Sequence, residues 1–170
     1  MLTNNGKKIV LESINELHSK IDAIYVSPFP RTIQTAHYVF KKYPNAKVLI
    51  ENRIREIDNG KYSGKTNNDD LDETRRKQIK GDYFIRFGEY GENKFDIESR
   101  LCSFLKDLYN NSKNDTVMII SHGSIISYMK RILNIKTQHI EMGRIEEFNN
   151  VDFSFLFKHI EKVNAINNMI

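Results

Sequence analysis

The sequence contains a single cysteine, Cys102, and no long hydrophobic run. One cysteine excludes an internal disulfide and suits a reducing compartment, so we expect a cytoplasmic protein. The apolar runs extend over only a handful of residues, which indicates neither a membrane-spanning helix nor a signal peptide. Histidine, aspartate and glutamate form no cluster with the spacing of metal ligands, and we expect no metal and no other cofactor.

The sequence also lacks a strong excess of either charge. Its 170 residues carry a net charge of +4, and 28% of them are charged. Basic residues are spread along the chain and interleaved with acids, which argues against a nucleic-acid partner. The small positive excess slightly favours anionic small molecules. With 39% hydrophobic residues, the chain has enough apolar side chains for one globular domain over residues 1–170.

The most informative stretch is residues 117–131. An apolar run typical of a buried strand ends in Ser121, His122 and Gly123, and an apolar helical segment follows at once. A histidine at the carboxyl end of a parallel strand, beside a helix N-terminus, lies where open α/β sheets bind anions. The alternative is that His122 only caps the helix.

A second segment has the same organisation. Residues 24–26 form a short apolar strand, Ser27 and Pro28 follow, and Arg31 falls in the first turn of the next helix. Pro28 suits a helix start because its missing N–H would have no partner there. Arg31, beside the positive end of the helix, provides the donors that a dianionic phosphate binds. The alternative is an ordinary capped helix with a solvated arginine.

A third segment follows the strand-like residues 47–50. It runs from residue 54 to residue 64 and carries Glu56 ahead of two glycines, Gly60 and Gly64. The carboxyl group of Glu56 is either a general acid or a plain surface carboxylate.

Hydrophobic periodicity predicts alternating elements along the chain. Helices are predicted at residues 6–21, 29–42, 68–80, 95–111 and 123–134. Strands are predicted at residues 23–27, 47–51 and 116–121, and two closing strands complete the chain. This alternation implies an α/β fold in three layers, with a mostly parallel sheet, right-handed crossovers and helices on both faces.

The three segments, in this order, resemble the histidine phosphatase superfamily, the phosphoglycerate-mutase-like proteins. The family's Ser-Pro-x-x-Arg-x-x-Gln-Thr-Ala pattern is met by Ser27, Pro28, Arg31, Gln34, Thr35 and Ala36. Its Arg-Glu-x-x-x-Gly-x-x-x-Gly element matches Arg55, Glu56, Gly60 and Gly64, and its Ser-His-Gly matches Ser121, His122 and Gly123. A weaker Gly-Glu-Ser element, followed by Asp and Arg, corresponds to Gly91, Glu92, Asn93, Asp96 and Arg100.

The resemblance implies a site and a reaction. In the family a histidine attacks phosphorus, and a carboxyl group protonates the leaving alkoxide without a metal. The catalytic roles would fall to Glu56 as the acid and to His122 as a donor to the transferring phosphoryl group. The phosphate-binding roles would fall to Arg31, Ser27, Gly123 and Glu92. The expected partner is a small phosphorylated metabolite or inorganic phosphate, and residues 65–90 would form a cap insertion, unless they are a plain surface excursion.

One family element is absent from the chain. The family's first strand carries Arg-His-Gly, whose histidine is the phosphorylated nucleophile, and no Arg-His-Gly occurs here. The other histidines, none of which follows an apolar strand ahead of a glycine, are His18, His37, His139 and His159. We therefore expect a phosphoglycerate-mutase-like fold with its first strand missing, truncated before the phosphoacceptor histidine and inactive in this form. Residues 153–160 resemble the family's last strand, which argues against a circular permutation.

The missing strand would lie beside residues 117–120. Each backbone group left buried without a partner would cost about 1 to 3 kcal/mol, and an open edge invites another chain. We therefore predict that residues 153–157 move in to pair with residues 117–120, or that a strand from another chain fills the gap and makes a homo-oligomer.

Three functions remain open. The first is a phosphatase for small phosphomonoesters; the short segment between Glu56 and Gly91 favours it over a mutase, because the mutases carry a longer insertion. The second is a non-catalytic phosphate-binding or protein-interaction domain of the same fold. The third is an unrelated hydrolase that uses Ser121 or Ser124 with His122. The absence of Gly-x-Ser-x-Gly argues against it.

Overall fold

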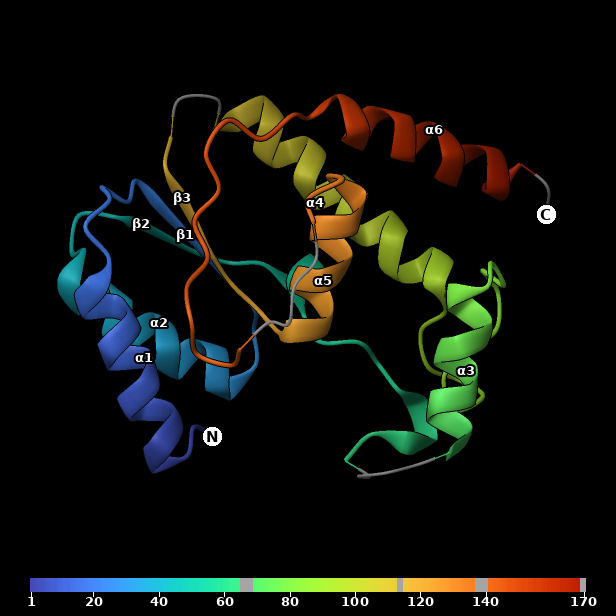
Figure 1. Ribbon diagram of the computed structural model, residues 1–170, viewed down its shortest axis with the longest axis horizontal. Coiled ribbons are helices and arrows are strands. Elements are labelled where there is room, and N and C mark those ends of the chain that lie inside the picture. Colours follow the sequence, from blue (N-terminus) through green and yellow to red (C-terminus); the bar gives the residue numbers. More distant parts are fainter. Residues whose placement is uncertain (65–68, 113–114, 137–140, 169–170) are drawn as a thin grey trace.

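Three short parallel strands form the sheet at the centre of the fold (Figure 1). The computed structural model describes residues 1–64, 69–112, 115–136 and 141–168. Within them, the strand order is β2 (Lys47–Ile50), β1 (Ala23–Val26), β3 (Val117–Ile120). Both outer strands pair with β1 in parallel, as the alternation of helices and strands predicts.

Helices α1 (Asn4–Glu16) and α2 (Pro30–Lys42) cover one face of the sheet. Alternate residues of β1 point to opposite faces, so Ile24 and Val26 meet these two helices. Both side chains are fully buried there, against Val10 and Ile14 of α1 and Val39 of α2.

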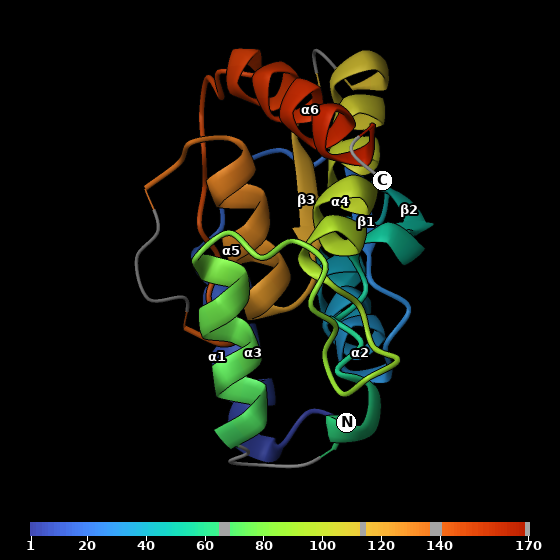
Figure 2. The ribbon, with the colours of Figure 1, turned by 90° about the vertical axis from the view of Figure 1, so that its right-hand side faces the viewer.

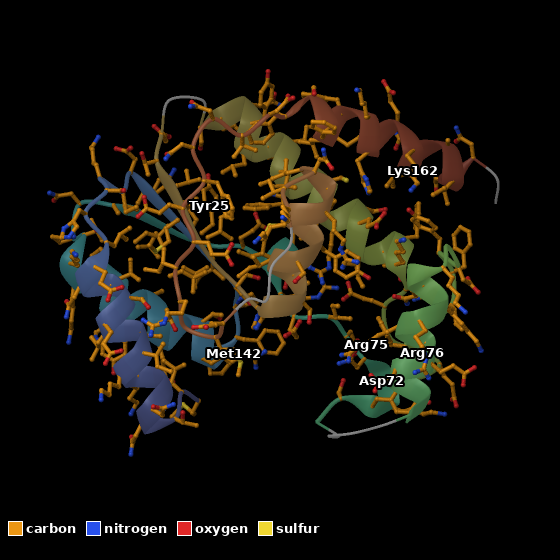
Figure 3. The ribbon with its side chains drawn as sticks, in the orientation of Figure 1. Tyr25, Asp72, Arg75, Arg76, Met142 and Lys162 are labelled. Atoms are coloured by element: carbon orange, nitrogen blue, oxygen red, sulfur yellow. The ribbon has the colours of Figure 1, made fainter. Side chains whose placement is uncertain are left out.

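The opposite face packs against α4 (Lys94–Asn111), α5 (Gly123–Ile132) and α6 (Ser154–Asn167). Tyr25 points to this side, as Figure 3 shows, and its ring meets that of Phe104 on α4 edge-on at 5.5 Å. Asn93 begins α4 with a capping box, because its side chain accepts from the Asp96 N–H and Asp96 accepts from the Asn93 N–H. The described residues therefore form three layers with helices on both faces of the sheet.

The remaining elements lie beyond the carboxyl ends of the strands. A long connection leaves β2 through two 3-10 turns, η1 (Asn52–Ile54) and η2 (Gly60–Tyr62), toward α3 (Asp69–Ile79). Figures 1 and 2 show α3 away from the sheet. The predicted cap, residues 65–90, includes α3, but its first four residues lie outside the described residues.

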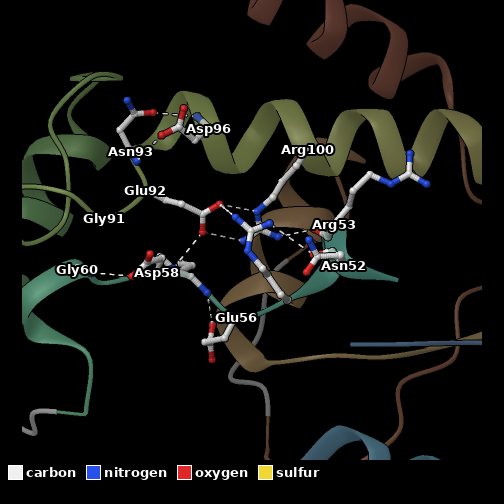
Figure 4. Close-up of polar contacts among 12 residues, drawn as sticks. Asn52, Arg53, Glu56, Asp58, Gly60, Gly91, Glu92, Asn93, Asp96 and Arg100 are labelled. Carbon is white, nitrogen blue, oxygen red and sulfur yellow. Dashed lines mark hydrogen bonds and ion pairs between the residues drawn. The ribbon is translucent and has the colours of Figure 1, made fainter. Parts of the chain in front are cut away.

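Two glycines allow this connection to touch the segment before α4. Gly60 has a φ of +55°, and the Glu92 N–H donates to Asp58 O at 2.9 Å. A Cβ added to Gly91 would lie 2.5 Å from Asp58 O and 2.6 Å from Gly60 N, so only glycine fits this crossing. The contact brings Glu92 next to the loop that carries Glu56 (Figure 4).

The predicted α/β fold with a parallel sheet is confirmed, with small shifts at the helix ends. The first helix ends at Glu16 rather than residue 21, because Leu17 is already extended, with a ψ of 120°. Leu17 and Ile21 are buried in the connection that follows, and this burial continues the apolar pattern past the helix. The second helix begins at Pro30, so Pro30 and not Pro28 takes its first position.

The predicted last strand at residues 153–160 is wrong, because residues 154–167 form the helix α6, and the described residues between α5 and α6 contain no strand. The alternating phenylalanines at positions 153, 155 and 157 resemble a strand pattern. Burial instead follows Leu156, Ile160 and Val163, a spacing of four and three that places all three on one helix face. The prediction that residues 153–157 pair with β3 is therefore wrong as well.

The outer edge of β3 is open among the described residues. Ile120 O accepts from the Ser27 N–H at 2.9 Å, so even-numbered residues of β3 turn their backbone groups to β1. Val117 and Ile119 turn theirs outward, where no described residue bonds to them. Each helix in the described part of the chain is too short or too polar to cross a membrane.

Candidate active site

Four of the predicted site residues meet at the carboxyl ends of β1 and β3. Ser27 follows β1 directly, and Arg31 lies in the first turn of α2. His122 stands just before α5, and Glu56 lies in the connection after β2. The two strand ends meet at one edge of a parallel sheet, so the fold brings these four side chains together from distant parts of the sequence.

His122 is buried, and both of its ring nitrogens have partners. Nε2 lies 2.8 Å from Ser27 Oγ, and Nδ1 lies 2.7 Å from Arg31 Nη2. An arginine only donates, so Nδ1 accepts, and the ring proton lies on Nε2 and donates to Ser27 Oγ. Burial, with the nearby charges of Arg31 and Arg100, lowers the pKa of His122 from 6.5 to about 4, so the ring is neutral at pH 7.

The alternative that His122 only caps the helix is right about its position and wrong about its side chain. His122 is the N-cap residue of α5, but its side chain makes no capping hydrogen bond. Gly123, the first residue of α5, faces open space, because a Cβ added to it would meet nothing within 4 Å. No described backbone group accepts from its N–H, so this donor lies at an open helix N-terminus beside His122.

Arg31 and Glu56 line a pocket of about 370 Å³. Arg31 Nη2 lies 3.5 Å from Glu56 Oε2, and the same oxygen lies 3.7 Å from His122 Nδ1. The Arg31 side chain is 43% exposed and rests over the Phe29 ring, so part of its guanidinium remains available to a ligand. The pocket is lined by Phe29, Arg31, Arg55, Glu56, Ile57, Asp58, Ser63 and Gly64.

Ser27 and Glu92 have other partners than the expected phosphate. Ser27 is fully buried behind His122. Glu92 is also buried, and its oxygens accept from Arg55 at 2.7 Å, from Arg100 at 2.8 Å and from the Asp58 N–H at 3.0 Å (Figure 4). A carboxylate that is already saturated repels a phosphate rather than binding it, so this geometry makes Glu92 a residue that positions arginines.

Arg55 lines the pocket, although no role in the site was predicted for it from the sequence. It appeared only as the companion of Glu56, although its position beside a motif carboxylate was a signal. In the structure it lines the pocket while one of its nitrogens holds Glu92. The pocket therefore presents two guanidinium groups, from Arg31 and Arg55.

The serine-hydrolase alternative does not fit the contacts. Ser121 Oγ donates to Ile54 O at 2.7 Å, away from the imidazole. The two nitrogens of His122 bond to Ser27 and Arg31, which leaves none for Ser121 or Ser124. Neither serine is therefore paired with a base.

The described histidines other than His122 contact different residues. His159 bonds to Glu98 at 2.9 Å, His37 packs beside Tyr38, and His18 is exposed. His139 lies outside the described residues. Among the residues that the structure describes, no group of three or more His, Cys, Asp and Glu side chains is placed to hold a metal ion.

Comparisons with known proteins identify the family of the chain. The model of the histidine phosphatase superfamily, branch 1, matches residues 1–156. Phosphoserine phosphatase 1 of Hydrogenobacter thermophilus is 30% identical over 127 residues, which are 71% of this chain and 58% of the relative. The chain thus spans less than two thirds of that relative's length.

Solved structures give the same fold. YhfR of Bacillus stearothermophilus is 25% identical with a TM-score of 0.61, over 79% of this chain and 68% of the other. A mycobacterial glucosyl-3-phosphoglycerate phosphatase in complex with VO3 is 18% identical with a TM-score of 0.64, over 80% and 70% of the two chains. The likeness to the mycobacterial phosphatase, at 18% identity, shows a shared fold alone. With the family model matching nearly the whole chain, the chain belongs to the histidine phosphatase superfamily, branch 1.

Proposed function

We propose that the pocket binds the phosphate group of a small phosphomonoester, or inorganic phosphate. The observation that carries the proposal is Arg31, whose partly exposed guanidinium faces the pocket from the first turn of α2. Charge-assisted hydrogen bonds from an arginine and free N–H groups at a helix start are the usual ligands of phosphate. The Gly123 N–H, at the open start of α5, would add a donor.

Glu56 supports a phosphatase chemistry. Its carboxyl group lines the pocket 3.5 Å from Arg31, so it would lie beside a phosphate held there. A carboxyl group in that place can protonate the alkoxide that leaves phosphorus. The name of one similar protein, a phosphoserine phosphatase, favours phosphatase rather than mutase ancestry. The substrate that we propose is any small phosphorylated metabolite that fits about 370 Å³.

The 170-residue chain, as we propose, turns over phosphomonoesters only at the background rate. In this structure the His122 side chain is 2% exposed and its two ring nitrogens bond to Ser27 and Arg31, so the imidazole is not placed to attack phosphorus. Loss of a nucleophile typically lowers catalysis by orders of magnitude. A phosphate site without turnover would make the chain a non-catalytic phosphate-binding or protein-interaction domain of the same fold.

The test is hydrolysis of p-nitrophenyl phosphate by the purified chain. We expect the wild type, Glu56→Gln and His122→Ala all to hydrolyse it no faster than the buffer does. Turnover by the wild type that either substitution abolishes would contradict the proposal, because it would show that a residue of this chain performs the attack.

Three further proposals concern the surroundings of the site. Residues 69–90, the described part of the predicted cap, cover the site, supported by Ser63 and Gly64, which line the pocket shortly before this segment. The protein is cytoplasmic, supported by its single cysteine, which is buried as a free thiol. It self-associates through the open edge of β3, supported by the outward backbone groups of Val117 and Ile119.

A further inference from the structure

Ser27 is the one described side chain that bonds to His122 Nε2, and it is fully buried. A serine hydroxyl both donates and accepts, unlike a carboxylate or an arginine. Ser27 can therefore accept from Nε2–H, as it does in this structure, or donate to an unprotonated Nε2. The contact permits both neutral forms of the His122 ring.

The other ring nitrogen is fixed by Arg31 in this structure. Nδ1 accepts from Arg31 Nη2 at 2.7 Å, and Arg31 also lies 3.5 Å from Glu56. A phosphate in the pocket would draw the Arg31 guanidinium toward its own oxygens, because charge-assisted bonds to an anion are stronger than a bond to a neutral nitrogen. Nδ1 would then lose its donor, and its lone pair would face an anion.

We infer that phosphate binding moves the His122 proton from Nε2 to Nδ1, with Ser27 rotating from acceptor to donor. Nδ1–H then donates to a phosphate oxygen, and the Ser27 hydroxyl donates to Nε2. Solvent water takes the proton that leaves Nε2 and supplies the proton that Nδ1 gains, so the ring stays neutral and no net proton is taken up. The inference rests on the proposed phosphate site, and it makes Ser27 a positioning residue that acts through His122.

The alternative of a doubly protonated ring is disfavoured by its surroundings. His122 is 5% exposed, Arg31 lies 2.7 Å away, and the nearest carboxylate oxygen, from Glu56, is at 3.7 Å. Without phosphate, an imidazolium here would be desolvated beside a cation, and burial would still disfavour the charged ring after Arg31 has turned to a phosphate. A change between neutral forms avoids that cost while it turns Nδ1 into a donor.

The test reads the two ring nitrogens directly by ¹⁵N NMR of the histidine-labelled full chain at pH 7. Without phosphate we expect a protonated Nε2 and an unprotonated Nδ1 for His122. With saturating inorganic phosphate we expect the reverse pattern. Phosphate that binds by calorimetry and leaves the proton on Nε2 would overturn the inference and leave the phosphate site standing. Failure of phosphate to bind would instead overturn the proposed function, and this inference with it.

Two variants at position 27 separate positioning from folding. Ser27→Ala removes the hydroxyl, and we expect phosphate affinity to fall about three- to tenfold, the value of one hydrogen bond, with no reversal of the ring proton. Ser27→Thr keeps a hydroxyl and should restore both the affinity and the reversal. Equal affinities and equal ring spectra in Ser27→Ala and the wild type, with both folded by thermal unfolding, would contradict the role of Ser27.

Discussion

At the scale of single residues, the proposed site depends on His122, a buried imidazole that stays neutral at pH 7. Burial and two arginines hold the pKa of His122 at about 4, and its neutral Nδ1 holds Arg31 in place. The sequence pointed to His122 and Arg31 by their places after two strands. It could not give the orientation of the ring, because Ser27 and Arg31 reach it only through tertiary contacts. The sequence could not give the partners of Glu92 either, because Arg55 and Arg100 reach it only through tertiary contacts.

This neutral histidine predicts how stability depends on pH. The unfolded chain takes up a proton at His122 near pH 6.5, whereas the folded chain takes it up only near pH 4. The unfolded state therefore binds more protons between these values, and stability falls as the pH drops through this window, by about 3 kcal/mol from this group. Denaturant titrations at pH 7 and pH 4 should show a smaller loss in His122→Gln than in the wild type.

The control for this measurement is His18→Gln, because His18 is exposed. It should lose as much stability as the wild type over the same range. A loss in His122→Gln as large as that of the wild type would mean that His122 does not titrate as described.

At the scale of elements, the sequence predicted best where local pattern and tertiary role agree. The strands β1 and β3 and the helices α2 and α5 begin and end within a few residues of the predicted places. Each strand is an apolar run between polar signals, and each helix has one apolar face. The prediction failed at α6, where alternating phenylalanines resemble a strand. The segment forms a helix because Leu156, Ile160 and Val163 then lie on one face and pack together on the core.

The crossing of the two loops at Gly91 is an element-level feature that can be tested. In Gly91→Ala the new Cβ would meet backbone atoms of Asp58 and Gly60 at 2.5 and 2.6 Å, which cannot move aside cheaply. We expect a loss of about 2 kcal/mol or more in the free energy of unfolding, and weaker phosphate binding, because Glu92 and Arg55 shift.

The matched control is Gly6→Ala, in the helix α1. There the new Cβ would meet only the Thr3 and Leu2 side chains, at 3.3 and 3.7 Å. Alanine favours a helix by roughly 1 kcal/mol over glycine, which offsets the close approach to Thr3, so this variant should lose much less stability than Gly91→Ala. A Gly91→Ala protein as stable as Gly6→Ala would show that the loops can separate without cost.

At the scale of the whole molecule, the sheet has an edge that predicts self-association. The outward backbone groups of β3 belong to Val117 and Ile119. Val117→Pro removes one outward N–H and no bond to β1, so we expect it to weaken association by at least about fivefold. Size-exclusion chromatography with light scattering, over a range of concentrations, measures this.

Two further variants test which edge of the sheet makes the contact between copies of the chain. Val117→Ala keeps the N–H and should associate as the wild type does. Val48→Pro removes an outward N–H from β2, the opposite edge of the sheet, and should also leave association unchanged. A wild type that is monomeric at every concentration would contradict the proposal, and loss of association only in Val48→Pro would move the contact to β2.

Arg31 is the residue on which the proposed phosphate site depends, and calorimetry with inorganic phosphate measures its contribution directly. The control is Arg144→Ala, because the Arg144 side chain is 42% exposed and lies 3.6 Å from Glu141, much as Arg31 is 43% exposed and lies 3.5 Å from Glu56. We expect a dissociation constant on the order of millimolar for the wild type and Arg144→Ala, and at least about tenfold weaker binding in Arg31→Ala. Equal binding by the wild type and Arg31→Ala would show that Arg31 does not bind phosphate and would contradict the proposed site.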